Sequence, residues 1–228
     1  MAFVYSGTEF GRDPIQRSKA QATKLGFNVV LDEETPFTAV DVSPIVVKLR
    51  EARPDYTIFQ GYATSVWPEV IRLSRDYGLK SQFMGTIWAM DRGIILQLGK
   101  AANGYIGVSP YTFITTGAKG EALSAIDAIR RKKDRNYDGY PSIPYMQSWY
   151  SGLMAKRAIE LTVDAGKPIT GPNLASALQG LKDWDTGGVF GVPVNIRDNR
   201  TPVGRIYKYE AARNFEPTPV SDWIVVKD

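Results

Sequence analysis

Short apolar runs alternate with amphipathic segments through the first 110 residues. The runs predict strands, and they are Ala2–Ser6, Phe27–Leu31, Tyr56–Gln60, Gln82–Gly85 and Gly104–Val108. Apolar residues spaced three and four apart predict the helices between them, at residues 11–25, 42–53, 66–77 and 93–98. Strands that alternate with helices require crossover connections, which predicts an α/β fold with a parallel sheet and helices on both faces.

The rhythm changes after residue 110, where helices follow one another without strands between them. Helical patterns cover residues 119–133, 144–165 and 173–182, and a Gly-rich segment follows at 185–191. The tail then alternates polar and apolar residues in two short strands at 205–209 and 223–226, which we expect to pair antiparallel. The three helices have apolar faces but no following strands to cover, so they pack on each other or on something else.

The chemical composition excludes several classes of enzyme. The 228 residues include no cysteine and no histidine, so a Ser-His-Asp triad, a thiol nucleophile and an imidazole or thiolate metal site are impossible. No G-x-G-x-x-G follows a strand and no P-loop motif is present, so we expect no nucleotide cofactor and no metal. The chain is therefore expected to bind rather than to catalyse, and we assign no catalytic residue.

The net charge of +4 arises from 28 basic and 24 acidic residues that are spread along the chain. One basic run, at residues 130–133, is interpreted as the solvated end of a helix and not as a nucleic-acid patch. No apolar run approaches the roughly 20 residues of a membrane span, and no signal peptide pattern precedes the first strand. We therefore expect no nucleic acid as a partner and no membrane-spanning segment among these residues.

Three loops combine hydroxyl or small residues with a large aromatic side chain. They follow the first, third and fourth predicted strands, at residues 6–11, 61–65 and 86–91. Ligands of parallel sheets bind beyond the carboxyl ends of the strands, so these loops are candidates for one wall of a binding cleft. The alternative is that their serines and threonines only cap helices. The acidic stretch Asp32–Glu34 is interpreted as a solvated loop.

Several segments resemble periplasmic solute-binding proteins of the Leu/Ile/Val-binding type. The pattern Y-x-x-x-x-[YF]-G of that family is matched by Tyr5, Phe10 and Gly11, and residues 77–85, YGLKSQFMG, form the most specific match. Residues 41–49, the strand GYIGV at 104–108 and the terminal DWI at 222–224 are also similar to the family.

The resemblance implies a type I periplasmic binding protein with two α/β lobes that lacks most of the first lobe. Residues 1–110 would form the second lobe, residues 111–184 a helical segment of the first lobe, and residues 185–228 the crossover and the strands that return to the second lobe. Most of the first lobe would precede Met1, and the helices lacking its sheet would be prone to self-association.

The implied function is the capture of a small carboxylate in the periplasm and its delivery to the permease of an ABC importer, without chemistry on the ligand. The ligand would be a branched-chain amino acid or an aromatic or aliphatic acid. The residues that the resemblance places at or near the ligand are Ser6, Thr8, Phe10, Tyr62, Ala63, Thr64 and Trp88.

The sequence departs from the family where amino-acid-binding members carry an acid that holds the ligand ammonium. Ile87 and Trp88 stand in that region, and Asp91 comes later in the chain. An aromatic or aliphatic acid therefore competes with an amino acid as the ligand. Two alternatives of other classes are a ligand-sensing regulatory domain on the same fold and a cofactor-dependent enzyme of flavodoxin-like architecture.

Overall fold

The computed structural model describes residues 1–36, 41–63, 66–114, 117, 119–133, 139–196, 198 and 200–226. The chain forms two compact units. Unit 1 comprises Met1–Ser109 and Tyr207–Thr218, and unit 2 comprises Pro110–Ile206 and Pro219–Asp228. The predicted site residues all belong to unit 1, so its architecture determines where they lie.

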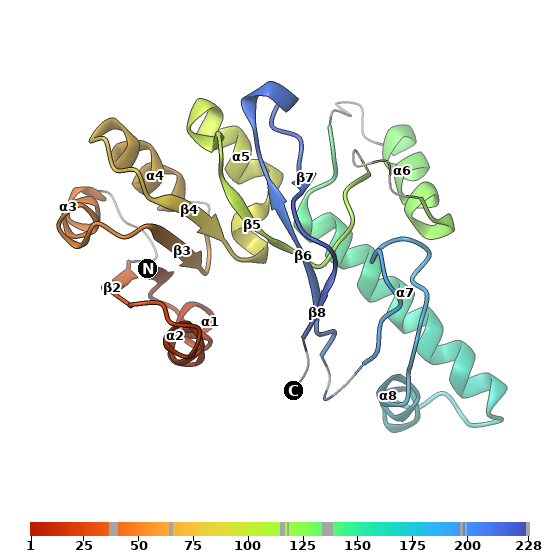
Figure 1. Cartoon of the computed structure of the whole chain (residues 1–228). Helices are drawn as coiled ribbons and strands as arrows, with labels where there is room; N and C mark the ends of the chain where they lie inside the picture. Colours follow the sequence, from red (N-terminus) through yellow and green to blue (C-terminus); the bar gives the residue numbers. More distant parts are fainter. Residues whose placement is uncertain are drawn as a thin grey trace. The chain divides into compact units, whose positions relative to one another are not determined.

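Unit 1 is an α/β layer structure (Figure 1). Its strands are β1 (Ala2–Ser6), β2 (Leu31–Thr35), β3 (Tyr56–Gln60), β4 (Gln82–Gly85) and β5 (Ile106–Ser109). Its helices are α1 (Glu9–Arg12), α2 (Ile15–Lys24), α3 (Ser43–Ala52), α4 (Trp67–Asp76) and α5 (Arg92–Leu98), with short 3₁₀ turns η1 (Ile87–Met90), η2 (Gly99–Ala102) and η4 (Ala211–Arg213). The predicted fold class is confirmed.

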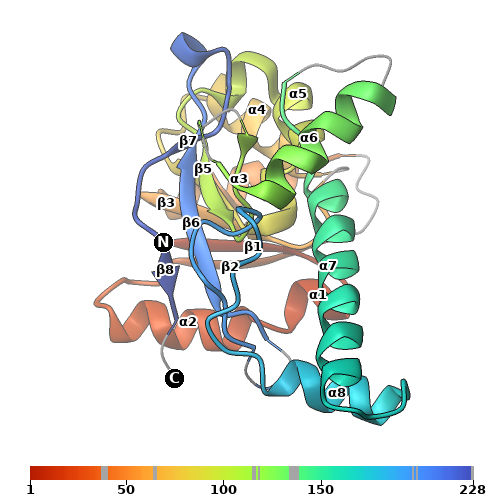
Figure 2. The ribbon, with the colours of Figure 1, turned by 90° about the vertical axis from the view of Figure 1, so that its right-hand side faces the viewer.

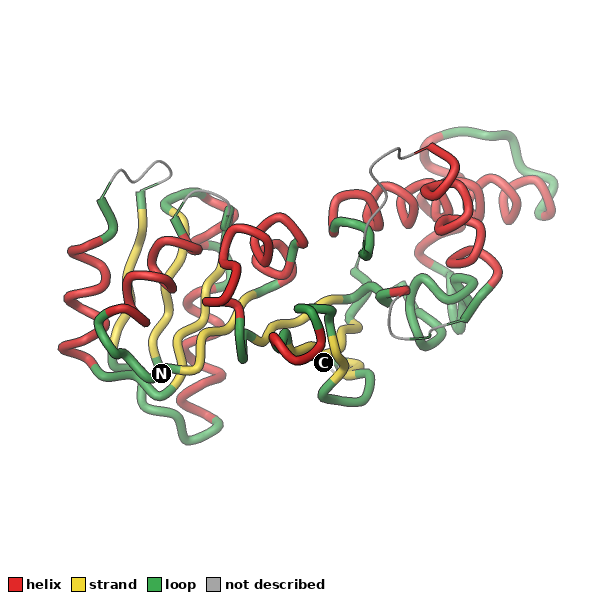
Figure 3. Tube along the Cα trace, turned by 90° about the horizontal axis from the view of Figure 1, so that it is seen from above, coloured by secondary structure: helices red, strands yellow, loops and turns green. Residues whose placement is uncertain are grey.

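The five strands of unit 1 lie in the order β2-β1-β3-β4-β5, and every neighbouring pair is parallel. The Tyr207–Lys208 end of β6 (Val203–Lys208) follows β5 in the sheet. The chain moves from β1 to β2 in one direction and then returns past β1 to β3, β4 and β5 in the other. Right-handed crossovers place the helices of the two directions on opposite faces, so α1 and α2 cover one face and α3, α4 and α5 cover the other (Figures 1 and 3).

The core of unit 1 contains a cluster of aromatic side chains between the sheet and α4. The Trp67 ring stacks on Phe59 at 4.9 Å between centroids and meets Phe83 edge-on at 5.7 Å. All three side chains have no solvent exposure. Burying each such side chain contributes about 1.5–3 kcal/mol, and Phe59 and Phe83 come from the strands that we predicted from apolar runs.

The second predicted strand, at residues 27–31, is wrong. The strand β2 begins at Leu31 and continues through the acidic stretch that we interpreted as a loop. β2 lies at the edge of the sheet, where cationic side chains from the neighbouring helices neutralise its carboxylates. The ion pairs are Lys19–Asp32, Lys48–Glu33 at 2.8 Å and Arg12–Glu34 at 2.6 Å. A charged edge strand resists pairing with another chain, which explains why it lacks an apolar run.

The single helix predicted at residues 11–25 is also wrong, since two helices occupy this region. α1 begins at Glu9 and ends at Arg12, and α2 begins at Ile15. Pro14 stands between them, and its missing N–H and fixed φ favour a helix start over a helix interior. As a result, the single turn of α1 lies directly after the short loop that follows β1.

Unit 2 contains α6 (Glu121–Lys133), α7 (Ile143–Asp164) and α8 (Gly171–Gln179), and α8 packs against α7 (Figure 2). The Gly-rich segment packs on the start of α6, where the Gly187 carbonyl accepts a hydrogen bond from the Leu123 N–H at 3.0 Å. In the tail, β8 (Ile224–Val225) pairs antiparallel with β6, as expected, and β7 (Thr218–Pro219) is a two-residue strand.

The basic run at the end of α6 is only partly solvated. Arg130 is buried, and its guanidinium donates to the Gly139 carbonyl at 3.2 Å, whereas the next three residues are exposed. Arg130 lies on the inward face of the helix, as helical periodicity requires for one residue in a run of four. Among the described residues, no helix combines the length and the apolar character that are needed to cross a membrane.

Candidate functional site

The strand order creates a switch point between β1 and β3. These strands are neighbours with Tyr5 opposite Gln60, but the chain leaves them in opposite directions. The loops that follow them therefore part at the carboxyl edge of the sheet, which is where open parallel sheets of this order bind ligands. The loop after β4 reaches the same edge, because β3 and β4 are parallel neighbours.

Ser6 and Thr8 connect the first two loops by hydrogen bonds. The two hydroxyl oxygens are 3.1 Å apart, and the Ser6 Oγ also accepts the Tyr62 N–H at 3.3 Å. Gly61 permits this close approach, because a Cβ on it would stand 2.0 Å from the Ser6 Oγ, and its φ is +129°. Thr8 is the N-cap of α1, where its hydroxyl accepts the Gly11 N–H at 3.1 Å. Both hydroxyls therefore serve the loop structure.

Phe10 and Tyr62 form an aromatic pair across the switch point. Their ring centroids are 5.4 Å apart and their planes are inclined at 48°. Phe10 is 38% exposed and Tyr62 is 48% exposed within this chain. The Gln60 side chain donates to the Phe10 carbonyl at 3.0 Å and so fixes the first turn of α1 beside β3. The predicted cleft wall thus contains a two-ring apolar surface.

Of the predicted site residues Ala63 and Thr64, the structure describes only Ala63. Ala63 is 2% exposed, so its methyl group contacts the protein interior and offers no surface for a ligand. Thr64 lies outside the described residues. Among the described residues of the third-strand loop, Tyr62 is the exposed one.

Trp88 lies in η1, directly after β4, and is half-buried. The turn is joined to the sheet by the Thr86 N–H, which donates to the Phe59 carbonyl at 3.1 Å. Asp91 ends the turn and caps α5, because its Oδ1 accepts the Gly93 N–H at 2.8 Å. The first acid after the turn is thus engaged in capping, and the half-buried Trp88 belongs to the turn that follows β4 at the carboxyl edge of the sheet.

Two tyrosines beneath η1 were not singled out from the sequence. The Tyr105 hydroxyl donates to the Ala89 carbonyl at 3.0 Å, and the Tyr209 hydroxyl donates to the Met90 carbonyl at 3.0 Å. The Trp67 indole N–H donates to the Tyr105 hydroxyl at 2.9 Å. Full burial raises the pKa of Tyr105 far above its ordinary value, so this hydroxyl stays protonated. In the sequence Tyr105 and Tyr209 resemble ordinary strand residues.

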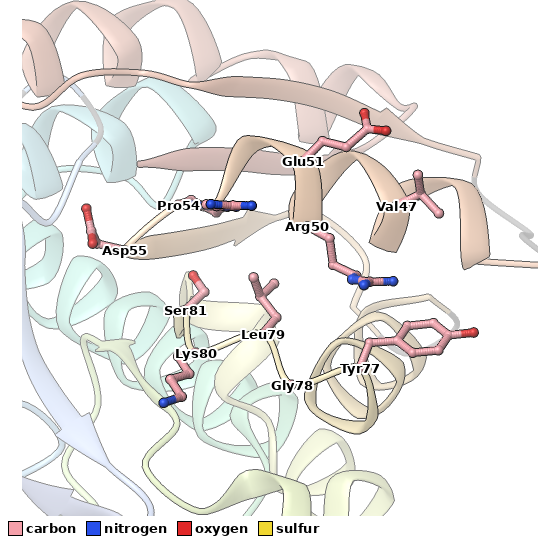
Figure 4. A pocket seen from close by; sticks show the side chains of 11 residues that line it. Val47, Arg50, Glu51, Pro54, Asp55, Tyr77, Gly78, Leu79, Lys80 and Ser81 are labelled. Atoms are coloured by element: carbon pink, nitrogen blue, oxygen red, sulfur yellow. The ribbon is translucent and has the colours of Figure 1, made fainter.

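A cavity of about 630 Å³ lies at the other edge of the sheet of unit 1 (Figure 4). It is lined by the ends of α3 and α4 and by the residues that enter β3 and β4, and the Arg50 guanidinium lies 5.2 Å from the Tyr77 ring centroid. A second cavity, of about 720 Å³, lies within unit 2 between α6, α7 and the segment 184–193. Neither coincides with the predicted cleft wall. In the described part of the chain, no group of three or more acidic side chains could hold a metal ion.

Comparison with known proteins identifies the relatives of the chain. The model of a family described as periplasmic binding protein matches residues 1–215. The Leu/Ile/Val-binding protein of Citrobacter freundii is 24% identical over 194 residues, which are 82% of this chain and 52% of that protein. The Leu/Ile/Val/Thr-binding protein of Salmonella typhimurium is 25% identical over 158 residues, or 69% of this chain and 41% of that protein. The chain thus spans about half the length of these curated relatives.

Solved structures agree on the fold. A branched chain amino acid ABC transporter protein from Thermus thermophilus, with bound valine, superposes with a TM-score of 0.82 at 19% identity, covering 99% of this chain and 60% of that chain. An ABC transporter substrate-binding protein from Aeropyrum pernix gives the same TM-score at 21% identity. The matched curated relatives are named as binding proteins and not as enzymes, in agreement with the expected class.

Proposed function

Because the chain belongs to the periplasmic binding protein family, we propose that it is the solute-binding component of an ABC importer and works in the periplasm. Its ligand is a small carboxylate, and its partner is the importer's permease. The carboxyl edge of unit 1 forms one wall of the binding cleft. The observation that carries the proposal is the exposed Phe10–Tyr62 pair at the switch point of the sheet.

The proposed ligand is held by its apolar part on this wall. Aromatic rings contribute apolar area at low entropic cost, and a flat or branched apolar group can pack on the Phe10–Tyr62 surface and on Trp88. Ser6 and Thr8 determine the shape of the wall through the bonds described above. The curated relatives are named for Leu, Ile and Val binding, and one structural neighbour is a fatty acid ABC transporter substrate-binding protein, so both amine-bearing and amine-free acids belong in the test.

The engagement of Asp91 bears on the class of the acid. A free ammonium group needs a carboxylate or several acceptors. The proposed wall residues Phe10, Tyr62 and Trp88 carry no carboxylate, and Asp91 is fixed at the start of α5 as its N-cap. We therefore expect acids without an amine to bind this wall at least as tightly as L-leucine does.

Saturation-transfer NMR tests the proposal, since it detects weak binding to a single wall. The probes are benzoate, hexanoate, L-leucine and L-valine, with benzamide as the uncharged counterpart of benzoate. We expect benzoate to receive saturation from the protein, and Phe10→Ala and Tyr62→Ala to abolish the transfer. If no acid in the panel receives saturation, a carboxylate-binding function is refuted. Equal transfer to benzamide and benzoate would agree with a wall that holds the ligand by its apolar part.

The chain offers a matched control pair at the other edge of the same sheet. The ring centroids of Phe27 and Tyr56 are 6.0 Å apart. The two side chains are 39% and 40% exposed, close to the values for Phe10 and Tyr62. Phe27→Ala and Tyr56→Ala should leave the transfer to benzoate unchanged. An equal loss in these variants would show that any exposed aromatic pair of this protein binds benzoate, and it would refute the assignment of the site.

The proposal extends to unit 2, whose helices we assign to the first lobe. Apolar side chains on α6, α7 and the turn after α7 are exposed, namely Ile129, Ile159, Val163 and Ile169, and α8 buries none of its residues within this chain. Such surface favours self-association or a covering partner. Sedimentation velocity with a dye for apolar surface tests this assignment, and a monodisperse monomer that binds no dye would contradict it.

A further inference from the structure

The underside of the Trp88 turn is held by two buried hydroxyl groups. Tyr105 and Tyr209 donate to the consecutive carbonyls of Ala89 and Met90, each at 3.0 Å. Both tyrosines have no solvent exposure, and their rings stack at 6.4 Å between centroids with planes 29° apart. A 3₁₀ turn leaves carbonyl groups without partners of its own, so these two donors determine where the turn sits.

The space for this arrangement is provided by two glycines in the neighbouring strands. A Cβ on Gly85 would stand 2.1 Å from the Tyr105 hydroxyl oxygen. A Cβ on Gly107 would stand 2.2 Å from the Met90 sulfur and 2.4 Å from the Gly85 carbonyl oxygen. Any larger residue at either position would displace the hydroxyl or the turn. The turn is therefore built into the sheet and is not a loose surface loop.

The two tyrosines directly flank the strands through which the chain leaves unit 1 and returns to it. Tyr105 precedes β5, after which the chain enters unit 2 at Pro110, and Tyr209 follows β6, through which the chain re-enters unit 1 at Tyr207. Their backbones are paired, since the Tyr209 N–H donates to the Tyr105 carbonyl at 2.9 Å. The turn that carries Trp88 is thus attached to both connecting strands at once.

We propose that Tyr105 and Tyr209 are positioning residues that hold the Trp88 turn in its ligand-ready place and tie it to the strands connecting the two units. The inference rests on the proposed function, because it takes the turn as part of the cleft wall. Neither hydroxyl reaches the ligand. Each acts through one carbonyl of the turn, so Trp88 stays at the cleft edge without the cost of ordering it when ligand arrives.

Tyr209→Phe is the cleaner test, because Tyr105→Phe also leaves the Trp67 indole N–H without its acceptor. Tyr150→Phe is the matched control, since it removes a buried hydroxyl that lies 2.8 Å from the Thr201 hydroxyl in unit 2. We measure amide hydrogen exchange of residues 86–91 and the ¹⁹F resonance of Trp88 in protein labelled with 5-fluorotryptophan, with Trp88→Phe to assign it.

Tyr209→Phe should speed exchange at the Ala89 and Asp91 amides about fivefold, the amount expected for one hydrogen bond, and should shift or broaden the Trp88 resonance. Tyr105→Phe should do the same more strongly, and Tyr150→Phe should change neither. An unchanged Trp88 resonance and unchanged exchange in Tyr209→Phe would overturn the positioning role. Equal changes in Tyr150→Phe would also overturn it, because they would report global destabilisation.

Binding of benzoate to the same variants separates this inference from the proposed function. If wild-type protein binds benzoate, the positioning role requires weaker binding in Tyr209→Phe than in Tyr150→Phe, and equal affinities overturn it. If wild-type protein binds no acid of the panel, the proposed function fails, and the exchange and ¹⁹F data alone decide whether the two tyrosines position the turn.

Discussion

Replacing Gly61 with alanine tests the packing of the switch point most directly. The new methyl group would stand 2.0 Å from the Ser6 Oγ and 2.7 Å from the Ser6 Cβ, and the φ of +129° is one that residues with a side chain rarely adopt. Backbone strain of this kind costs about 1–3 kcal/mol, and overpacking costs about 1–3 kcal/mol more. We expect Gly61→Ala to lower the free energy of unfolding of unit 1 by about 2–6 kcal/mol.

Gly78→Ala is a reference for an alanine at a positive φ without crowding. Gly78 follows α4 with a φ of +76°, but a Cβ on it would meet nothing within 4 Å. This control therefore carries the backbone penalty alone, about 1–2 kcal/mol. The difference between the two variants contains the crowding against Ser6 and the added strain of the φ of +129°, and removal of the Ser6 side chain isolates the crowding.

The assay is urea unfolding, monitored by hydrogen-exchange mass spectrometry. Peptides that cover β1 and β3 report the unfolding of unit 1 separately from that of unit 2. The double variant Ser6→Gly/Gly61→Ala completes the test, because removing the Ser6 side chain should recover most of the difference between Gly61→Ala and Gly78→Ala. If Gly61→Ala costs no more than Gly78→Ala, or if Ser6→Gly brings no recovery, the close approach of the two loops is refuted.

Three further predictions concern the core and the edge of the molecule. Phe83→Ala leaves a cavity beside Trp67 and should destabilise unit 1 by about 3–5 kcal/mol in the same urea assay. A loss below about 1 kcal/mol would contradict the placement of Phe83 in the core of unit 1. Leu123→Ala, in α6, should lower the free energy of unfolding measured on peptides of unit 2 by about 2–5 kcal/mol. The free energy measured on peptides of unit 1 should stay unchanged. The Glu34 side chain accepts hydrogen bonds from Arg12, which lowers its pKa, so its small stabilising effect is complete at neutral pH and is lost as the pH falls below about 4. The difference in melting temperature between wild type and Glu34→Gln should therefore shrink on acidification, and a difference that stays constant would show that the ion pair does not stabilise the fold.

The sequence predicted the interior of unit 1 better than its edge, for a physical reason. The strands β1, β3 and β4 were predicted at their observed bounds because they lie inside the sheet and carry residues that are buried along most of β1 and at alternate positions of β3 and β4. β2 was misplaced by four residues because an edge strand can carry charges when cations lie beside it. Local apolarity therefore identifies buried strands and misses charged edge strands.

The candidate site shows a similar division between local and long-range information. The loops after β1, β3 and β4 were correctly placed at one edge of the sheet, because the carboxyl ends of parallel strands meet there. The burial of Ala63 depends on packing that no spacing rule contains. The hydrogen bonds beneath the Trp88 turn join residues 16 and 119 positions apart, and no local pattern pairs such partners.

Exposure of aromatic side chains does not by itself identify the cleft wall in this protein. The pairs Phe10–Tyr62 and Phe27–Tyr56 are nearly equal in exposure and in ring separation, and β3 leads from the second pair toward the first. They differ in topology. Phe10–Tyr62 lies where the chain leaves neighbouring strands in opposite directions, so no crossover covers that point of the sheet. The site is therefore assigned from strand order, which the hydrophobic pattern alone does not determine.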